Sequence, residues 1–310
     1  MINLYIDEIW KKKDFSSKFV DFKVESWLSA RMLQNLGKQA LQIIKSQRKK
    51  KHKHKPVFKR DSIDLDSRFL DIQFDLNSFD VWFKIASIGN KINLKLPGRF
   101  HKHTHKFASW KLKKSCKLRK VNKKYFIDIF FEKDAPDLKT KGKTVGVDIG
   151  YKKLIVTSEN KKYDTGLEDV YEKISRKRQG SKAFKRALKE RDNKINESIN
   201  KMPLSKIKTL ITEDLKNVKQ KSKGKIKKKF NNKLQRWSYS KVLNMLSLRC
   251  EEFGILFKKI NPAYTSQKCC NCGFTHKNNR HGEIFLCVNC GEEKDADYNA
   301  SLNILALGSL

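Results

Sequence analysis

The sequence lacks any apolar run long enough to cross a membrane, and no secretory signal opens it. Acidic residues are scarce, because 33 Asp and Glu stand against 70 Lys and Arg, for a formal net charge of +37. An excess on this scale repels itself in the folded state unless a polyanion neutralises it. The basic residues are spread along the chain rather than gathered on one amphipathic helix, which favours a nucleic acid over a membrane surface. We therefore expect a nucleic-acid-binding protein with no membrane partner, located in the cytoplasm and associated with the nucleoid if the host is prokaryotic.

The hydrophobic content is nevertheless that of a folded protein. Hydrophobic residues make up 38% of the chain and 19 of its residues are Phe, which excludes a simple basic tail. A length of 310 residues is enough for two or three domains with a core. A ribosomal or chromatin-like binder is compatible with this composition as well.

Cysteine is sparse, but four of the seven cysteines form two Cys-x-x-Cys pairs separated by fourteen residues. Two such pairs can present four thiolates to one tetrahedral zinc ion. A redox or disulfide role is the alternative, but the missing secretory signal and the scattered Cys116, Cys250 and Cys270 favour a reducing compartment. With all four positions taken by sulfur, the zinc is predicted to be structural. The predicted zinc ligands are Cys269, Cys272, Cys287 and Cys290.

The first 60 residues predict a helix followed by a basic linker. Apolar residues recur at helical spacing between positions 33 and 44. Nine Lys and Arg then fall within residues 45–60, where Lys49, Lys50 and Lys51 are candidate phosphate contacts. A solvated linker is the alternative interpretation of this run.

Residues 62–133 alternate between apolar and polar side chains, which is the period of a half-buried strand. We expect short antiparallel strands within 70–76, 81–85, 92–96, 110–112 and 125–131, closing into a small barrel or sandwich. His101, His103 and His105 lie between them, and a surface location is favoured over a second metal site.

The second half alternates between predicted strands and helices. Strands are expected at 144–150, 154–157, 207–212 and 254–260, a helical hairpin at 170–202, and a helix at 237–253. A basic loop at 216–229 holds eight lysines. The candidate nucleic-acid contacts in this half are Arg176, Lys177, Arg178, Lys182, Lys227, Lys228 and Lys229.

Three acidic residues stand at comparable positions near apolar segments. Asp148 lies in the strand at 144–150, Glu213 directly follows the strand at 207–212, and Asp297 opens the last helix. Magnesium prefers such oxygen ligands, and two ions about 4 Å apart can cleave a phosphodiester. Asp148 could alternatively cap the turn that follows its strand.

These residues also carry a family resemblance. Gly146-Val-Asp148-Ile-Gly150, Thr212-Glu213-Asp214-Leu215 and Asp295-Ala-Asp297-Tyr-Asn299 resemble the three RuvC motifs of TnpB, the RNA-guided nuclease of insertion sequences and a relative of the compact type V CRISPR effectors. The resemblance covers residues 90–310 most clearly, and the chain starts with a shortened N-terminus relative to the family. Its register selects Glu213 over Asp214 and Asp297 over Asp295, which could assist or cap.

The resemblance implies a multidomain α+β and α/β fold, with an RNase H-like RuvC nuclease domain that contains an inserted zinc ribbon. It implies a truncated helical recognition segment with a basic linker at 1–60, a wedge-like β-barrel at 61–140, the first RuvC part at 141–262, a target-nucleic-acid-binding zinc ribbon at 263–294, and the last RuvC motif at 295–310. The implied activity is RNA-guided cleavage of DNA by two magnesium ions held by the catalytic residues Asp148, Glu213 and Asp297.

The implied partners are a guide RNA and double-stranded DNA, and a second copy of the chain or more RNA could supply the surface that the short N-terminus lacks. The alternative function is an RNA-guided or non-specific DNA-binding protein, such as a repressor, with little or no cleavage. The three acids argue against this alternative and the short N-terminus argues for it.

Overall fold

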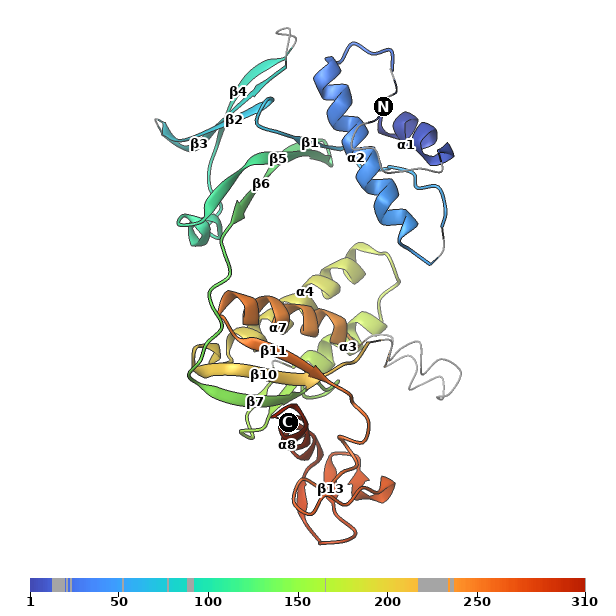
Figure 1. Cartoon of the computed structure of the whole chain (residues 1–310), viewed down its shortest axis with the longest axis vertical. Helices are drawn as coiled ribbons and strands as arrows, with labels where there is room; N and C mark the ends of the chain where they lie inside the picture. Colours follow the sequence, from blue (N-terminus) through green and yellow to red (C-terminus); the bar gives the residue numbers. More distant parts are fainter. Residues whose placement is uncertain are drawn as a thin grey trace. The chain divides into compact units, whose positions relative to one another are not determined.

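The structure is a computed structural model that describes residues 1–310 except 13–19, 21, 23, 52, 77, 88–91, 165, 217–233, 235–236 and 310. The chain divides into two compact units, Met1–Asp134 and Ala135–Leu310 (Figure 1). None of the described helices is long and apolar enough to cross a membrane.

Two helices open the first unit. Helix α1 (Ile2–Lys11) packs against α2 (Ala30–Arg48), and their buried residues form one apolar cluster. Helix α2 buries Leu36, Ala40 and Ile44, so the helix predicted from the apolar spacing is confirmed. The prediction missed α1, although its apolar residues recur at the same helical spacing.

The strands of the first unit form two antiparallel three-stranded sheets, in the orders β1-β5-β6 and β2-β3-β4. Their bounds are β1 (Ser62–Leu65), β2 (Leu70–Leu76), β3 (Phe79–Ala86), β4 (Asn93–Gly98), β5 (Lys111–Val121) and β6 (Lys124–Glu132), with a short 3-10 helix, η1 (Thr104–Phe107), before β5. Phe69, Ile85 and Cys116 belong to the core between them. Strand β5 is far longer than the predicted segment at 110–112. Its lysines obscure the alternation of apolar and polar residues, so the part of the strand that buries Cys116 was not predicted. The closed barrel stays a prediction.

The second unit is built on one five-stranded sheet in the order β11-β10-β7-β8-β9. Strand β10 runs parallel to β7 and β11, whereas β8 runs antiparallel to both β7 and β9. The bounds are β7 (Lys143–Asp148), β8 (Ile155–Thr157), β9 (Lys162–Tyr163), β10 (Ile207–Glu213) and β11 (Leu256–Ile260). The four strands predicted in this half are confirmed, and β9 is an addition to them.

Helices cover both faces of this sheet (Figure 1). Helices α3 (Leu167–Ser175), α4 (Lys182–Asn200) and α7 (Tyr239–Glu252) share one apolar core with Val145, Val147 and Leu210. A 3-10 helix, η2 (Leu204–Lys206), leads from α4 into β10. Side chains alternate along a strand, so Gly146 and Ile211 face the other side, where helix α8 (Ala296–Ser309) lies. The predicted helical hairpin and the predicted helix at 237–253 are both confirmed.

Helix α8 lies so close to the sheet that glycine is required at two contact points. A Cβ built on Gly146 would stand 2.3 Å from the Ser301 carbonyl oxygen, and one on Gly308 would stand 2.4 Å from Cγ2 of Ile211. Such distances are shorter than any real carbon contact. Gly146 therefore lets α8, and with it Asp297, approach β7, and Gly308 lets α8 approach β10.

A small three-stranded sheet precedes α8, in the order β12-β13-β14. It comprises β12 (Arg280–His281), β13 (Ile284–Leu286) and β14 (Glu293–Asp295), after a 3-10 helix, η3 (Lys277–Asn279). Strand β13 pairs antiparallel with both β12 and β14. Strand β14 continues directly into α8, so this small sheet is anchored to the larger one.

Candidate metal centres: a cysteine cluster and a carboxylate cavity

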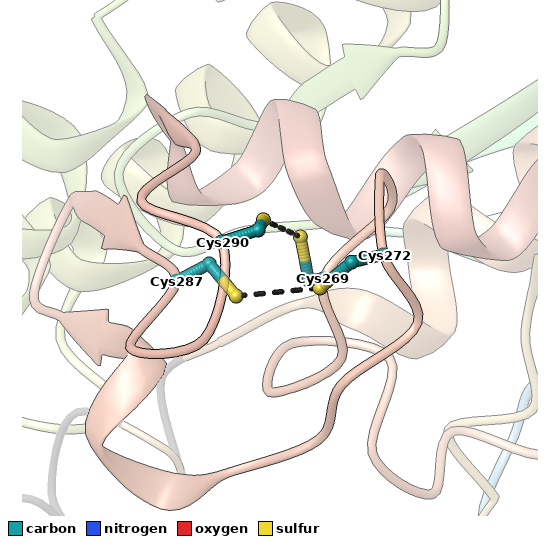
Figure 2. A group of neighbouring side chains, drawn as sticks. All are labelled: Cys269, Cys272, Cys287 and Cys290. Atoms are coloured by element: carbon teal, nitrogen blue, oxygen red, sulfur yellow. Dashed lines mark hydrogen bonds between the residues drawn. The ribbon is translucent and has the colours of Figure 1, made fainter.

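The four cysteines predicted as zinc ligands converge on one point (Figure 2). Their sulfur atoms all lie within 4.8 Å of one another, with 3.7 Å between Cys269 and Cys290 and 3.6 Å between Cys272 and Cys287. Four sulfurs about 2.3 Å from a tetrahedrally bound zinc ion are separated by about 3.8 Å. The cluster could therefore hold a metal ion, and its sulfur spacing suits zinc.

The two Cys-x-x-Cys turns have the same local geometry. The N–H of Gly273 donates to the Cys269 carbonyl at 3.0 Å, and the N–H of Gly291 donates to the Cys287 carbonyl at 2.9 Å. Both glycines have positive φ, of 76° and 73°, which explains why each turn ends on glycine.

One thiol of the cluster is already prepared to ionise. Hydrogen bonds from the backbone N–H of Phe274 and from the side chain of Asn289 lower the pKa of Cys272 to about 6. Because the thiolate is the form that binds metal, these hydrogen bonds favour metal binding by Cys272.

The carboxylates of Asp148 and Glu213 are neighbours at one edge of the large sheet. Thr212 pairs with Val147 in the parallel register, so the next residue of each strand is an acid. Both strands end there, and both side chains line a cavity of about 500 Å³. Asp297, in the first turn of α8, lines the same cavity. The structure thus gathers the three predicted acids from three distant parts of the chain.

Asp297 contacts two cations. Its Oδ1 accepts a hydrogen bond of 2.9 Å from Nη2 of Arg280, and its Oδ2 lies 3.6 Å from Nζ of Lys153. The Asp297 side chain is only 14% exposed, so solvent screens these pairs weakly. Neither cation was predicted as a site residue.

The pKa values show that negative charge in the cavity is only partly offset. Desolvation, followed by the charges of Glu213 and Asp297, raises the pKa of Asp148 to about 8, against the opposing charge of Arg280. Desolvation also raises the pKa of Glu213, although a hydrogen bond from Thr265 and the charge of Arg280 oppose the shift. Carboxylates with raised pKa values in a cavity are the environment that a cation would stabilise.

Asp295 plays a different part from Asp297. Its Oδ1 accepts hydrogen bonds from the backbone N–H groups of Asp297 and Tyr298, at 3.1 and 3.2 Å, and so caps α8. Although desolvation opposes them, hydrogen bonds from Lys153 and Lys162 hold its pKa well below the usual range. Asp295 does not line the cavity.

Two further side chains at the cavity escaped the sequence analysis. The indole Nε1 of Trp237 donates to the Gly150 carbonyl at 3.0 Å, which fixes the turn after Asp148. The hydroxyl of Thr265 donates to Oε1 of Glu213. Nothing in the sequence spacing shows that Trp237 and Thr265 meet residues 87 and 52 positions away.

The two clusters differ in how closely their ligand atoms gather. Within the part of the chain that the structure describes, only the four cysteines form a group of three or more potential ligands around one point. The three carboxylates share a cavity without closing on a single centre.

The structure describes most of the residues predicted to contact nucleic acid, and their role stays a prediction. Lys49, Lys50 and Lys51 are exposed at the end of α2 and just after it. Four more are exposed at the α3–α4 turn, where Arg176 is paired with Glu172 at 3.0 Å. These four are Arg176, Lys177, Arg178 and Lys182. Lys227, Lys228 and Lys229 lie outside the described residues.

Comparison with known proteins places these features in one family. Residues 239–304 match the family model of the Cas12f1-like TNB domain. The chain is 42% identical over 97 residues to the CRISPR-associated endodeoxyribonuclease Cas12f1 of Sulfoacidibacillus thermotolerans, covering 31% of this chain and 21% of that protein. It is 27% identical over 193 residues to a TnpB-like protein of Methanocaldococcus jannaschii, covering 59% of this chain and 66% of that one.

The fold is also that of a solved member. The structure of a Cas12f1–sgRNA–target DNA complex superposes with a TM-score of 0.56 at 16% identity, over 88% of this chain and 70% of that one. The chain spans less than two thirds of either curated relative. The matched domain contains both cysteine pairs and Asp297, and the TnpB-like match extends the similarity beyond it. The chain is also 34% identical over 76 residues to a putative transposase of Methanocaldococcus jannaschii, covering 22% of this chain and 70% of that protein, and it belongs to the family of TnpB proteins and compact type V effectors.

Proposed function

We propose that this protein is an RNA-guided, magnesium-dependent DNA endonuclease that hydrolyses phosphodiesters at the carboxylate cavity. The observation that supports this most strongly is the convergence of Asp148, Glu213 and Asp297 from three distant segments on one cavity. In this proposal the second unit is an RNase H-like RuvC domain with an inserted zinc ribbon, and the first unit comprises the recognition helices and the β-barrel. The domain boundaries are those that the family resemblance implies.

The residues at the cavity fit divalent metal. Carboxylate oxygens are the hard ligands that magnesium prefers, and the raised pKa values of Asp148 and Glu213 reflect negative charge that a cation would stabilise. Asp148, Glu213 and Asp297 would hold two ions. Bound magnesium supplies an activated water on one side of the phosphate and charge compensation at the leaving oxygen on the other.

The chain's own residues have separate tasks in this reaction. Asp148 must give up its proton before it can act as a ligand, so metal binding and cleavage should weaken as the pH falls. Arg280 lines the cavity and carries a fixed positive charge, which suits a phosphate oxygen of the substrate. Trp237 holds the turn that follows Asp148 and so limits its movement.

The cysteine cluster is proposed to hold a structural zinc ion through Cys269, Cys272, Cys287 and Cys290. All four tetrahedral positions are then filled by sulfur, which leaves none for substrate. The role of the zinc is to fold the β12-β13-β14 sheet, whose strand β14 leads into Asp297. Stability of the zinc ribbon would thus determine the position of one catalytic acid.

Guide RNA and double-stranded DNA are the proposed partners. Support comes from the formal net charge of +37 and from a relative whose solved complex contains sgRNA and target DNA. Binding through several phosphates releases counterions, so affinity should fall about tenfold or more over a few-fold rise in salt. Binding that does not respond to salt would exclude a groove that follows the phosphate backbone.

Guide-dependent binding without cleavage is the second candidate. The contacts of Asp297 favour it, because Arg280 and Lys153 already offset the charge of this acid. A protein with this arrangement could grip DNA and act as a repressor. Tight guide-dependent binding with no cutting in any divalent metal would establish this alternative.

The test uses the full chain purified with co-expressed RNA. Sequencing the copurified RNA identifies the guide, and a matched DNA duplex is then offered in magnesium. We expect cleavage by the wild type and a loss of about a thousandfold or more in Asp148→Ala, since removal of a metal ligand disables the site. Asp295→Asn is the matched control, because this neighbouring acid caps α8 outside the cavity. Cleavage that survives Asp148→Ala would overturn the proposal.

A further inference from the structure

Thr265 joins the zinc ribbon to the carboxylate cavity. It lies between β11 and the first cysteine pair and is 2% exposed. Its Oγ1 donates a hydrogen bond to Oε1 of Glu213, which ends β10. A hydroxyl on the ribbon side is therefore in direct contact with a predicted magnesium ligand.

Two oxygen atoms lie where they could accept the hydrogen of the Thr265 hydroxyl. Oγ1 also lies 3.1 Å from the carbonyl oxygen of Pro262, and a hydroxyl has one hydrogen to donate. A carboxylate is the stronger acceptor, so the hydrogen is directed to Glu213. One oxygen of Glu213 is then fixed, and the other remains for a ligand in the cavity.

The backbone at Thr265 is itself held in place. Nδ2 of Asn303, a residue of α8, donates to the Thr265 carbonyl at 2.9 Å and to the Lys268 carbonyl at 2.7 Å. Asn299, one turn earlier in α8, also donates to the Lys268 carbonyl at 2.9 Å. Lys268 directly precedes Cys269. The helix that carries Asp297 thus also fixes the segment that orients Glu213.

We propose that Thr265 is a positioning residue, which orients the Glu213 carboxylate for divalent metal through its hydroxyl. This inference rests on the proposed function. It assigns to the segment before the zinc ribbon a role beyond folding, because Thr265 aligns one predicted magnesium ligand while α8 supplies another. Hydrogen-bonded partners of metal ligands affect affinity strongly, and their removal typically weakens metal binding by about 10–100-fold.

The test compares Thr265→Val, which is nearly isosteric but lacks the hydroxyl, with Thr265→Ser, which keeps it. Thr212→Val is the matched control, because Thr212 is next to Glu213 and its buried Oγ1 has no hydrogen-bond partner among the described residues. Binding of Mn²⁺ to the full-length protein is measured by calorimetry. Zinc content and the thermal transition are measured in parallel, and Thr265→Ala replaces the valine variant if either changes.

We expect Thr265→Val to weaken Mn²⁺ binding about tenfold or more, Thr265→Ser to restore most of the affinity, and Thr212→Val to match the wild type. Asp148→Ala defines which Mn²⁺ binding belongs to the cavity. If Asp148→Ala abolishes that binding but both Thr265→Val and Thr265→Ala keep it at wild-type strength, the positioning role is wrong and the proposed function stands. If Asp148→Ala binds Mn²⁺ as the wild type does, both are wrong.

Discussion

The cysteine cluster and the carboxylate cavity of the second unit assemble their ligands in opposite ways. The four sulfurs come from residues 269–290, already stand 3.6–3.7 Å apart in pairs, and need only the ion. The three acids come from positions 148–297 and are held partly by protein groups, Thr265 on Glu213 and Arg280 on Asp297. Ligands that lie close together in the sequence can be gathered by local turns, whereas ligands from distant segments depend on the whole fold.

Removal of one cysteine sulfur is expected to have the largest effect of the substitutions that distinguish the two sites. Cys269→Ser is expected to abolish zinc binding and to destabilise the second unit by about 3 kcal/mol or more, because binding of structural zinc contributes directly to folding. Zinc content by mass spectrometry and thermal unfolding measure both effects.

Cys270→Ser is the control for this substitution. Cys270 is adjacent to Cys269 but belongs to neither Cys-x-x-Cys pair and is not part of the converging cluster. We expect it to keep its zinc and its stability. Equal losses in the two variants would contradict the assignment of the ligands.

The carboxylate cavity should instead be sensitive to changes in distant packing. Gly146→Ala would place a Cβ 2.3 Å from the Ser301 carbonyl oxygen and push α8 from the sheet. We expect a loss of about 1–3 kcal/mol of stability. Cleavage and Mn²⁺ binding should fall further than zinc content, because Asp297 moves relative to Asp148.

Gly37→Ala in α2 provides the comparison, since its Cβ would make only ordinary contacts, at 3.4 Å or more. Alanine inside a helix is favoured over glycine by about 0.5–1 kcal/mol. A neutral or slightly stabilising effect is therefore expected. Unchanged Mn²⁺ binding in Gly146→Ala would show that α8 does not position Asp297.

The charge of Asp148 should make the metal-free protein less stable as the pH rises. Its folded pKa of about 8 exceeds the unfolded value of about 3.9, so the folded state binds more protons between these limits and the unfolding free energy falls across them. Asp148→Asn removes this contribution and should be more stable than the wild type above pH 8, by about 1.4 kcal/mol or more.

Thermal unfolding of the zinc-loaded protein in buffer free of magnesium and manganese, at several pH values, checks this difference. Added Mn²⁺ should stabilise the wild type and leave Asp148→Asn nearly unchanged, because only a bound ligand shifts the transition. A gap between the two proteins that shrinks as the pH rises would contradict the direction of the shift.

The sequence predicts the cysteine cluster better than the surroundings of the acids, for a physical reason. A Cys-x-x-Cys turn is local, so its geometry follows from spacing and from glycines such as Gly273. The proximity of Asp148 and Glu213 could be predicted only because each acid lies at the end of a predicted strand. Their catalytic role stays a prediction. Thr265 and Arg280 were not found, because their partners are set by the packing of α8 and not by any nearby residue.

Prediction of the strands and helices from the sequence is limited in the same way. Strands with clear alternation and helices with an apolar stripe were predicted, as β10 and α2 show. Strand β5 was largely missed because lysines occupy much of it, and its pairing with β1 and β6 decides its length. Long-range pairing of this kind leaves little trace in the local pattern.

The smallest effect is expected at the edge of the cavity. Lys152 pairs with Glu283 on the surface, where both side chains are about half exposed. Lys152→Ala should change stability by less than about 1 kcal/mol and leave both metals bound, because exposed ion pairs contribute little. Thermal unfolding with zinc and Mn²⁺ titration checks this expectation, and a loss of either metal would show that the pair supports a site.

The central claim is that three acids form a two-ion site beside a cysteine-bound zinc. The most direct measurement is a crystal structure of the protein grown with Mn²⁺, with anomalous scattering recorded for manganese and for zinc. We expect two manganese peaks about 3.5–4 Å apart between Asp148, Glu213 and Asp297, and one zinc peak among the four sulfurs. Manganese found only outside the cavity, with Asp297 still bound to Arg280, would contradict it.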